Sequence, residues 1–289
     1  AFLGKRQPGP GIQDLEVPQM GGAGSLTARD VPRASPLRTF VIVSQRRSGA
    51  RLLADTLSTH PSIECGGELL VNVSRQTETN LTLELLDSWH QQAVAASTDR
   101  GKPGKAYAVG FKLMDNQWAN QKEVLQRFCQ EHKVRVVFLW RRNGLRRVVS
   151  LLARHYQTSV PPACTHVAYT RSKVCALALG KQKVSLPSGE SLLRVLRKDS
   201  EQRKAAEAVF SDNRQGSLRV HYEDIIRSSA SPNKEWRRVQ TFLGVEAMDL
   251  QTQYEPIHQS LPLEETIEGF KVVAETLRTS EYKGLLSGT

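Results

Sequence analysis

Short apolar runs alternate along this chain with longer stretches in which apolar residues recur every three or four positions. The run at residues 40–43 is typical of a buried strand, and the helical spacing of Leu52, Leu53 and Leu57 follows it and stops at His60. Three later runs predict further strands, at residues 107–114, 134–140 and 217–222. Helical patterns separate these strands. We therefore predict an α/β fold with three layers, α/β/α, around a mostly parallel central sheet.

Two regions depart from this alternation. Residues 1–36 are rich in Gly and Pro, so we expect a disordered lead-in before a single domain over residues 37–289. Residues 158–190 contain three prolines and two of the four cysteines, which predicts an insertion such as a hairpin or a lid, or else a structural loop with no role. A pairing of Cys164 with Cys175 stays open. The four cysteines show no metal-ligand spacing.

The turn between the first strand and the first helix carries the most specific chemistry. A glycine turn that opens a helix presents backbone N–H groups and the positive end of the helix dipole to an anion. Three arginines add positive charge around Gly49. We expect a phosphate or sulfate to bind at Arg46, Arg47, Ser48, Gly49, Ala50, Arg51 and Leu52. The alternative is an ordinary strand-to-helix turn with solvated arginines.

This turn differs from the phosphate loop of nucleotide hydrolases that use magnesium. Such a loop reads Gly-x-x-x-x-Gly-Lys-Ser/Thr, and its hydroxyl binds the metal. The turn here has no Gly-Lys-Ser/Thr, and no obvious acid that would hold magnesium follows a strand. The turn therefore weighs against a metal-dependent kinase or nucleotide hydrolase.

A second anion site is predicted after the strand at residues 134–140. Arg142 lies at the mouth of a turn, and Ser150 lies eight residues later in an apolar helical pattern. A guanidinium fork suits a dianionic phosphate, and a hydroxyl fixes its orientation. The alternatives are the pair Arg146 and Ser150, one helical turn apart, or arginines that only solvate a helix start.

The two sites, in this order, resemble the sulfotransferase family, and the closest likeness is to bacterial-type carbohydrate and glycolipid sulfotransferases. In that family a strand, Arg-Ser-Gly and a helix bind the 5′-phosphosulfate, and an arginine with a serine eight residues later binds the 3′-phosphate. Arg47-Ser48-Gly49 and the pair Arg142 and Ser150 match those motifs. Similar segments also include Gly67-Glu68, residues 110–114, 222–224 and 242–245, so the resemblance covers about residues 38–286. One departure is Ala50, where the family often has Ser or Thr.

The resemblance implies a fold like that of the P-loop nucleotide hydrolases and a defined reaction. A sulfuryl group would move by in-line displacement from 3′-phosphoadenosine 5′-phosphosulfate to a hydroxyl or amine of a carbohydrate, glycolipid or small metabolite. The product nucleotide would be 3′,5′-ADP, and no metal would be required. Arginines and backbone N–H groups can stabilise the charge of such a transfer.

The resemblance also implies catalytic residues. Glu68 would take the proton of the acceptor, and Arg47, with Arg46 next to it, would stabilise charge on the transferred group. The alternative for Glu68 is an acid in the first turn of a helix, and His60 is the competing base. Lys112 is a weaker candidate for charge stabilisation, because a lysine in a strand can simply extend its amine to solvent.

The charge of the chain bears on its partners. A formal net charge of +11 favours anionic partners. Aromatic residues make up only 6% of the chain and do not alternate with a basic stripe, so we expect no nucleic acid partner. The expected partner is a small-molecule or glycan acceptor, and the sequence says nothing of oligomeric state.

The compartment is weakly constrained by the sequence. No run of 18 apolar residues exists, so we expect no transmembrane segment in this chain. Because the chain begins at Ala1 rather than Met, a signal, transit peptide or membrane anchor before it stays open. Two glycosylation sequons, at Asn72 and Asn80, occur about as often as chance predicts. We favour the cytoplasm slightly over the Golgi lumen.

Two other functions compete with sulfuryl transfer. A metal-dependent kinase or nucleotide hydrolase could use a related α/β fold, although the turn lacks its motif. A catalytically inactive, sulfotransferase-like binding module is the other alternative, and Ala50 in place of a hydroxyl residue is its best support.

Overall fold

The computed structural model describes residues 37–70, 79–100, 107–119, 121–153, 162–164, 170–226, 234–255, 257 and 261–287. The lead-in predicted at residues 1–36 lies outside this part of the chain, as do parts of the predicted insertion. All that follows concerns the compact unit formed by residues 34–289.

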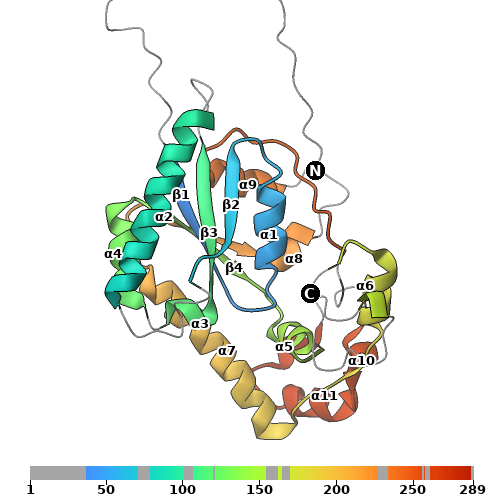
Figure 1. The fold of residues 1–289 in the computed structure, drawn as a ribbon. Helices are drawn as coiled ribbons and strands as arrows, with labels where there is room; N and C mark the ends of the chain where they lie inside the picture. Colours follow the sequence, from blue (N-terminus) through green and yellow to red (C-terminus); the bar gives the residue numbers. More distant parts are fainter. Residues whose placement is uncertain are drawn as a thin grey trace, which may run out of the picture. The chain divides into compact units, whose positions relative to one another are not determined.

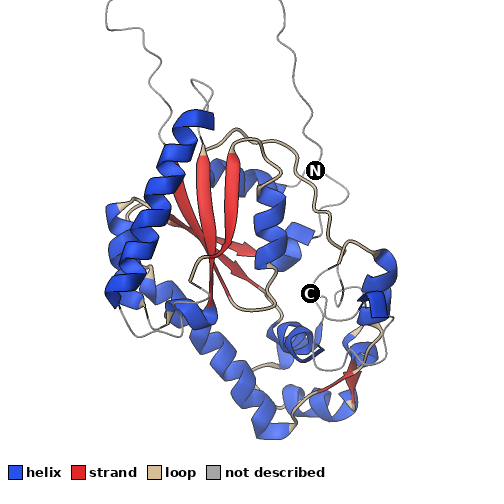
Figure 2. Ribbon diagram, viewed as in Figure 1, coloured by secondary structure: helices blue, strands red, loops and turns tan. Residues whose placement is uncertain are grey.

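A five-stranded parallel sheet forms the centre of this unit (Figures 1 and 2). Its order is β2-β3-β1-β4-β6, and every neighbouring pair is parallel. The strands are β1 (Arg38–Ser44), β2 (Ile63–Glu68), β3 (Ala108–Met114), β4 (Arg135–Trp140) and β6 (Ser217–His221). The predicted α/β fold with a mostly parallel sheet is confirmed.

The edge strand β2 is the one that the hydrophobic pattern does not predict. Its sequence, Ile-Glu-Cys-Gly-Gly-Glu, has only one buried residue, Ile63. A single strand neighbour and a register shift between Cys65 and Glu68 explain how two glycines are tolerated there. The strand forms because β3 offers it a hydrogen-bonding partner.

Helices cover both faces of the sheet and give the predicted three layers. Side chains of β1 alternate between two hydrophobic clusters, with Phe40 and Ile42 in one and Val41 and Val43 in the other. The first cluster includes residues of α1 (Ala50–Leu57), α8 (Tyr222–Ile226) and α9 (Lys234–Leu243). The second includes residues of α2 (Thr79–Arg100), α4 (Lys122–Glu131) and α7 (Gly189–Val209).

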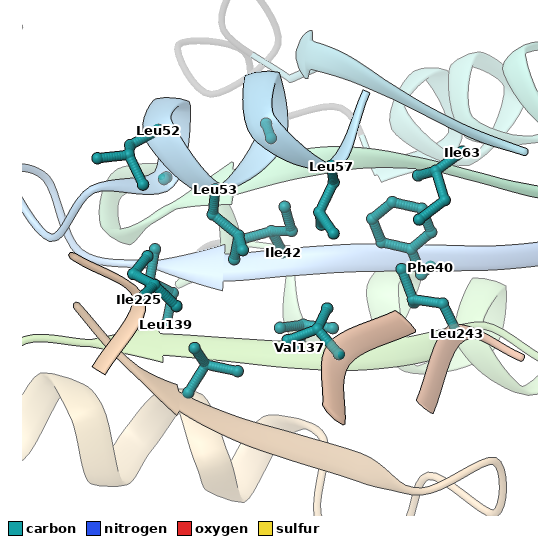
Figure 3. Close-up of a cluster of buried hydrophobic side chains, with 14 of the residues drawn as sticks. Phe40, Ile42, Leu52, Leu53, Leu57, Ile63, Val137, Leu139, Ile225 and Leu243 are labelled. Carbon is teal, nitrogen blue, oxygen red and sulfur yellow. The ribbon is translucent and has the colours of Figure 1, made fainter. Parts of the chain in front are cut away.

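Figure 3 shows how α1 packs on the first face. Leu53 and Leu57 of α1 point toward Ile42 and Phe40 of β1, and Leu139 of β4 lies close by (Figure 3). Leu53 and Leu57 are fully buried, so each removes an entire apolar side chain from water. Such burial stabilises the fold by about 1.5–3 kcal/mol for each side chain and fixes α1 against the sheet.

A smaller layer lies beside the sheet and contains the C-terminal part of the chain. Its hydrophobic cluster joins α5 (Gly144–Leu152) to α10 (Leu263–Thr266) and α11 (Phe270–Arg278). A two-stranded parallel sheet, β5 (Val184–Ser185) and β7 (Ile267–Glu268), belongs to the same layer. The 3₁₀ helix η4 (Lys283–Ser287) closes it.

The predicted insertion contains short helices where the structure describes it. These are η3 (Pro162–Cys164) and α6 (Lys173–Gly180), joined by a disulfide between Cys164 and Cys175. Thr170 forms a β-bridge with Glu255, which ties this segment to the late part of the chain. The pairing that the sequence left open is therefore present.

The connections of the sheet determine where a ligand would bind. β1 leads to α1 on one face, whereas its neighbour β3 leads through α3 (Asp115–Trp118) to α4 on the other face. Open α/β sheets bind ligands outside the carboxyl ends of the strands where such a change of direction occurs. The turn after β1 lies at this point.

Candidate anion and catalytic site

The turn after β1 has the backbone conformation of an anion-binding loop. Gly49 is the N-cap residue of α1, has a φ of 91°, and offers no side chain to cap the helix. Arg47 also has a positive φ, 69°. A helix leaves its first N–H groups without intrahelical partners, so this end of α1 can donate to an anion.

Close packing also requires a glycine at position 49. A Cβ atom placed there would lie 2.5 Å from Cδ2 of Tyr222. The neighbouring Ser48 is fully buried, and in the described part of the chain its hydroxyl oxygen has no hydrogen-bond partner. Buried polar groups are nearly always paired, and a bound anion would supply such a partner.

The three arginines of the turn have different neighbours. Arg46 Nε lies 3.2 Å from Oδ1 of Asp115, which follows β3. Arg51 Nε donates to Asp55 at 3.2 Å along the exposed side of α1. Arg47 Nε donates to Ser150 Oγ at 3.1 Å. The contact of Arg47 connects the first predicted site to the second.

Ala50 and Leu52, both predicted at the site, could contact an anion through their backbone alone. Both side chains are buried in the hydrophobic cluster of the first face. Ala50 therefore offers no side-chain ligand, and Leu52 anchors the helix.

In the second predicted site, Ser150 lies next to the turn after β1, but Arg142 binds a different residue. Ser150 is buried in α5 and contacts Arg47. Arg142 instead binds both carboxylate oxygens of Asp224 at 2.6 Å each. This hydrogen bonding raises the pKa of Arg142 above its ordinary value. Arg142 and Ser150 share one edge of the sheet, but Arg142 contacts Asp224 and Ser150 contacts Arg47.

The alternative partner, Arg146, has a structural role. Its backbone N–H donates to Asn143 Oδ1 at 3.0 Å, which caps α5. Its Nη1 donates to the carbonyl oxygen of Leu261 at 3.1 Å. Burial lowers the pKa of Arg146, and the charge of Arg141 lowers it further. These contacts attach α5 to the C-terminal layer.

Behind the turn lies a buried ionic cluster centred on Asp199 of α7. Asp199 is 2% exposed and forms ion pairs with Arg147 and Arg203. Arg147 Nη1 donates to the carbonyl oxygen of Arg46 at 3.1 Å, and Arg203 Nε donates to Gln45 Oε1 at 3.2 Å. The cluster therefore holds the backbone of the turn in place.

Sequence reasoning did not single out Asp199 or Arg203. They lie four residues apart on one helix, a spacing that is usual for exposed ion pairs. Only the packing of α7 beside the turn shows that Asp199 is fully buried and that Arg203 is partly buried.

A second group of buried charges lies after β4 and β6. The Arg141 guanidinium lies 4.8 Å from the ring centre of Tyr222, and its Nε lies 3.9 Å from Glu223 Oε1. Burial lowers the pKa of Arg141 and raises that of Tyr222. Glu223 also accepts the backbone N–H of Arg142 at 3.0 Å. The segment after β6 thus supports both Gly49 and Arg142.

Glu68 lies at the carboxyl end of β2, on the same edge of the sheet as the turn. The interpretation of Glu68 as an acid in the first turn of a helix is therefore wrong, because it ends a strand. Its carboxylate is exposed and accepts a hydrogen bond from Gln117 Nε2 at 3.2 Å. In the sheet it pairs with Lys112, a mostly buried residue of β3.

His60 is occupied by structural contacts. The ring accepts the backbone N–H of Ser62 at Nδ1, 2.9 Å away, so Nε2 carries the proton and donates to the carbonyl oxygen of Glu246 at 2.9 Å. His60 is buried before β2 begins, at the opposite end of that strand from Glu68. These contacts favour Glu68 over His60 as a base.

An acid that the sequence analysis did not single out follows the predicted strand at residues 107–114. Asp115 directly follows β3, the neighbour of β1, and is 9% exposed. Asp115 thus occupies a position after a strand, and its carboxylate is paired with Arg46 at 3.2 Å. Among the described residues, one other group, Asp87, Glu131 and His132, has metal-ligand atoms close together. His132 precedes β4, so that group lies at the amino edge of the sheet.

Taken together, the carboxyl edge of the sheet holds cations from the ends of β1 and β4 and a carboxylate from the end of β2. Such an arrangement can bind an anion with two charged groups and place a base beside it. Within the described residues no helix is both long enough and apolar enough to cross a membrane. Comparisons of the chain with protein-family models and with curated proteins give no match.

Proposed function

We propose that this protein is a sulfotransferase that uses 3′-phosphoadenosine 5′-phosphosulfate. The contact between Arg47 Nε and Ser150 Oγ, at 3.1 Å, carries the proposal. It joins the turn that resembles a 5′-phosphosulfate loop to the helix that resembles a 3′-phosphate site. A nucleotide with phosphates at both positions matches two adjacent anion sites on one edge of a sheet.

The residues present fit that nucleotide. The buried hydroxyl of Ser48 and the N-terminus of α1 would receive the 5′-phosphosulfate, beside the glycine whose Cβ position Tyr222 occupies. Ser150 and Arg142 would receive the 3′-phosphate. Because the Asp224 carboxylate binds the Arg142 guanidinium, the 3′-phosphate would replace Asp224 there or share the guanidinium with it.

The proposed chemistry assigns one role to each residue. Glu68 takes the proton from the acceptor hydroxyl or amine as that group attacks sulfur. Arg47 stabilises the negative charge that develops on the oxygens of the transferred group and of the leaving phosphate. Gln117, which donates to Glu68, orients its carboxylate. The acceptor is a carbohydrate, glycolipid or small metabolite with a nucleophilic hydroxyl or amine.

One observation favours a second function, a metal-dependent kinase or nucleotide hydrolase. Asp115 follows β3, a position suited to holding a metal beside a phosphate loop. Its carboxylate is instead paired with Arg46 at 3.2 Å, and the turn has arginine where such loops have lysine. These features support sulfuryl transfer more than metal-dependent phosphoryl transfer.

Thermal stability with added nucleotide tests the proposal. A ligand at about a hundredfold its dissociation constant adds about 2.7 kcal/mol to the free energy of unfolding. We expect stabilisation by 3′,5′-ADP without metal, and a smaller effect in Arg142→Ala. Stabilisation by ATP with magnesium alone would support the kinase instead. Binding of 3′,5′-ADP without turnover on any acceptor would indicate an inactive module, which Ala50 favours.

The disulfide bears on the proposed compartment. Disulfides persist in oxidising environments and are rare in the cytosol. The bond between Cys164 and Cys175 therefore favours a lumenal or extracellular location over the cytoplasm that the sequence slightly favoured. Blocking free thiols in native cell extract, followed by mass measurement, would show whether this pair is oxidised in the cell.

A further inference from the structure

Helix α6 exposes an apolar surface that the site described above does not use. Val174 is 71% exposed and Leu177 is 58% exposed, the two highest values among large apolar side chains of the described residues. They lie three positions apart and so share one face of the helix. We define this pair, with the basic residues around it, as the α6 patch.

The opposite face of α6 explains why the patch points outward. Cys175, Ala176 and Leu179 are buried with Cys164 and Ile257 in a small hydrophobic cluster. The disulfide fixes Cys175 to Cys164, and Ser172 Oγ caps the helix by accepting the N–H of Cys175 at 3.3 Å. Within the part of the chain that the structure describes, α6 therefore packs through this buried side, and Val174 and Leu177 face outward.

The charge along the segment that forms the patch has a single sign, and the β-bridge between Thr170 and Glu255 brings one acid beside it. Residues 171–183 contain four basic residues and no acidic one. All four are exposed, and they are Arg171, Lys173, Lys181 and Lys183. Lys173, Leu177 and Lys181 follow one another at four-residue spacing, so the lysines lie at both ends of the apolar stripe.

We propose that the α6 patch docks on an anionic lipid membrane surface. Helices that lie in a membrane interface combine aliphatic side chains with lysine and arginine beside them. The aliphatic tips enter the headgroup region while each lysine extends its amine to the lipid phosphates. The proposal does not depend on sulfotransferase activity.

The composition of the patch favours a membrane over a protein partner. The cores of protein interfaces are enriched in aromatic residues and depleted in lysine, and a stable interface buries about 800 Å² on each side. The α6 patch offers two aliphatic tips and three lysines, of which Lys173 begins the eight-residue helix and Lys181 and Lys183 follow its end. A negatively charged lipid surface complements that charge without requiring a shaped partner.

Docking at α6 would also orient the molecule. The Arg171 guanidinium lies 5.5 Å from the ring centre of Tyr254, and the hydroxyl of Tyr254 donates to Asp55 of α1. The patch is thus connected through two side chains to the helix that begins at the anion-binding turn. Figure 1 shows α6 apart from the five-stranded sheet.

Sedimentation with vesicles tests the docking. The full chain is mixed with vesicles of phosphatidylcholine, with and without phosphatidylserine, at low and at physiological ionic strength. We expect binding only with phosphatidylserine, and weaker binding as salt screens the charges. We expect the double variants V174S/L177S and K173E/K181E each to lower the partition coefficient about tenfold or more.

Matched variants elsewhere separate the patch from the overall charge. V272S changes an apolar side chain that is 56% exposed on α11, and K271E/K283E reverses two exposed lysines, one on α11 and one on η4. We expect both to bind like the original chain, and all four variants to melt at the same temperature. Equal binding by the α6 variants and the original chain would overturn the proposal. If V174S/L177S instead abolishes self-association and leaves vesicle binding intact, the patch is an interface between copies of this chain.

Discussion

Arg47 and Ser150 lie 103 residues apart in the chain, yet Nε of the arginine donates to Oγ of the serine at 3.1 Å. The contact exists because β1 and β4 are parallel neighbours, so the segments that follow them meet at the same edge of the sheet. It explains why the two segments predicted to bind anions lie side by side.

The first prediction concerns the hydroxyl of Ser150. A hydrogen bond to a charged group contributes about 1.5–3 kcal/mol, so Ser150→Ala should weaken binding of 3′,5′-ADP by roughly tenfold or more. Titration calorimetry measures this directly. Ser211→Ala changes an exposed serine at the end of α7 and should leave the affinity unchanged. Unchanged affinity in Ser150→Ala would remove Ser150 from the proposed 3′-phosphate site.

The second prediction concerns Glu68 as the base. Removing a general base lowers the rate by about 10²–10⁴-fold, so Glu68→Gln should lose turnover to that extent. The affinity for 3′,5′-ADP should stay the same, because the carboxylate faces Gln117 rather than the anion-binding turn. Glu64→Gln is the matched control, since Glu64 is an exposed acid on the same strand. A rate loss of equal size in both variants would argue against a catalytic role for Glu68.

The third prediction concerns Gly49. An alanine there would adopt a left-handed conformation at about 1–2 kcal/mol and would clash with Tyr222 at a further cost of about 1–3 kcal/mol. Gly49→Ala should therefore lower the free energy of unfolding by about 2–5 kcal/mol, as measured by urea denaturation. Gly269 also has a positive φ but has open space around it, so Gly269→Ala isolates the conformational part. Equal losses in the two variants would show that Tyr222 moves away.

The fourth prediction concerns the buried acid Asp199. Removing one partner of a buried ion pair costs about 3–5 kcal/mol, since the remaining charge is left without compensation. Asp199→Asn leaves two arginines, Arg147 and Arg203, in that position. Chemical denaturation should show this loss. Asp249→Asn breaks an exposed pair with Arg237 and should cost less than about 1 kcal/mol. A small loss in Asp199→Asn would mean that water reaches the cluster.

The fifth prediction concerns the pH dependence of stability through Glu207. Burial acts to raise the pKa of this carboxyl, but hydrogen bonds from Arg219 and Trp140 outweigh burial and lower it. A lowered pKa in the folded state stabilises the fold above the pKa of the unfolded chain, about 4.3, and this stability is lost as the pH falls through the folded value.

Comparison with Glu207→Gln measures that contribution. The difference in the free energy of unfolding between the original chain and the variant should be about 1–3 kcal/mol near neutral pH. It should shrink as the pH falls below about 4.3, where the unfolded chain takes up the proton first. A difference that stays constant into acid would show that the hydrogen bonds do not depend on the charge of Glu207.

Periodicity in the sequence was sufficient to predict the layered fold and the turn after the first strand. Phe40, Ile42, Leu53 and Leu57 repeat with the period of a strand and then of a helix, and those periods depend only on local backbone geometry. Gly49 between them was recognisable as the start of a helix. Local patterns of this kind are carried by neighbouring residues, so the sequence reveals them.

Only the tertiary structure decided which side chains of the site meet. In the folded chain Arg47 contacts Ser150, Arg142 binds Asp224, and Asp199 is buried behind the turn. The tertiary structure also added β2, whose glycine-rich sequence becomes a strand only beside β3. These outcomes depend on the order of strands in the sheet and on burial, which join residues far apart in the chain and leave no periodic trace in it.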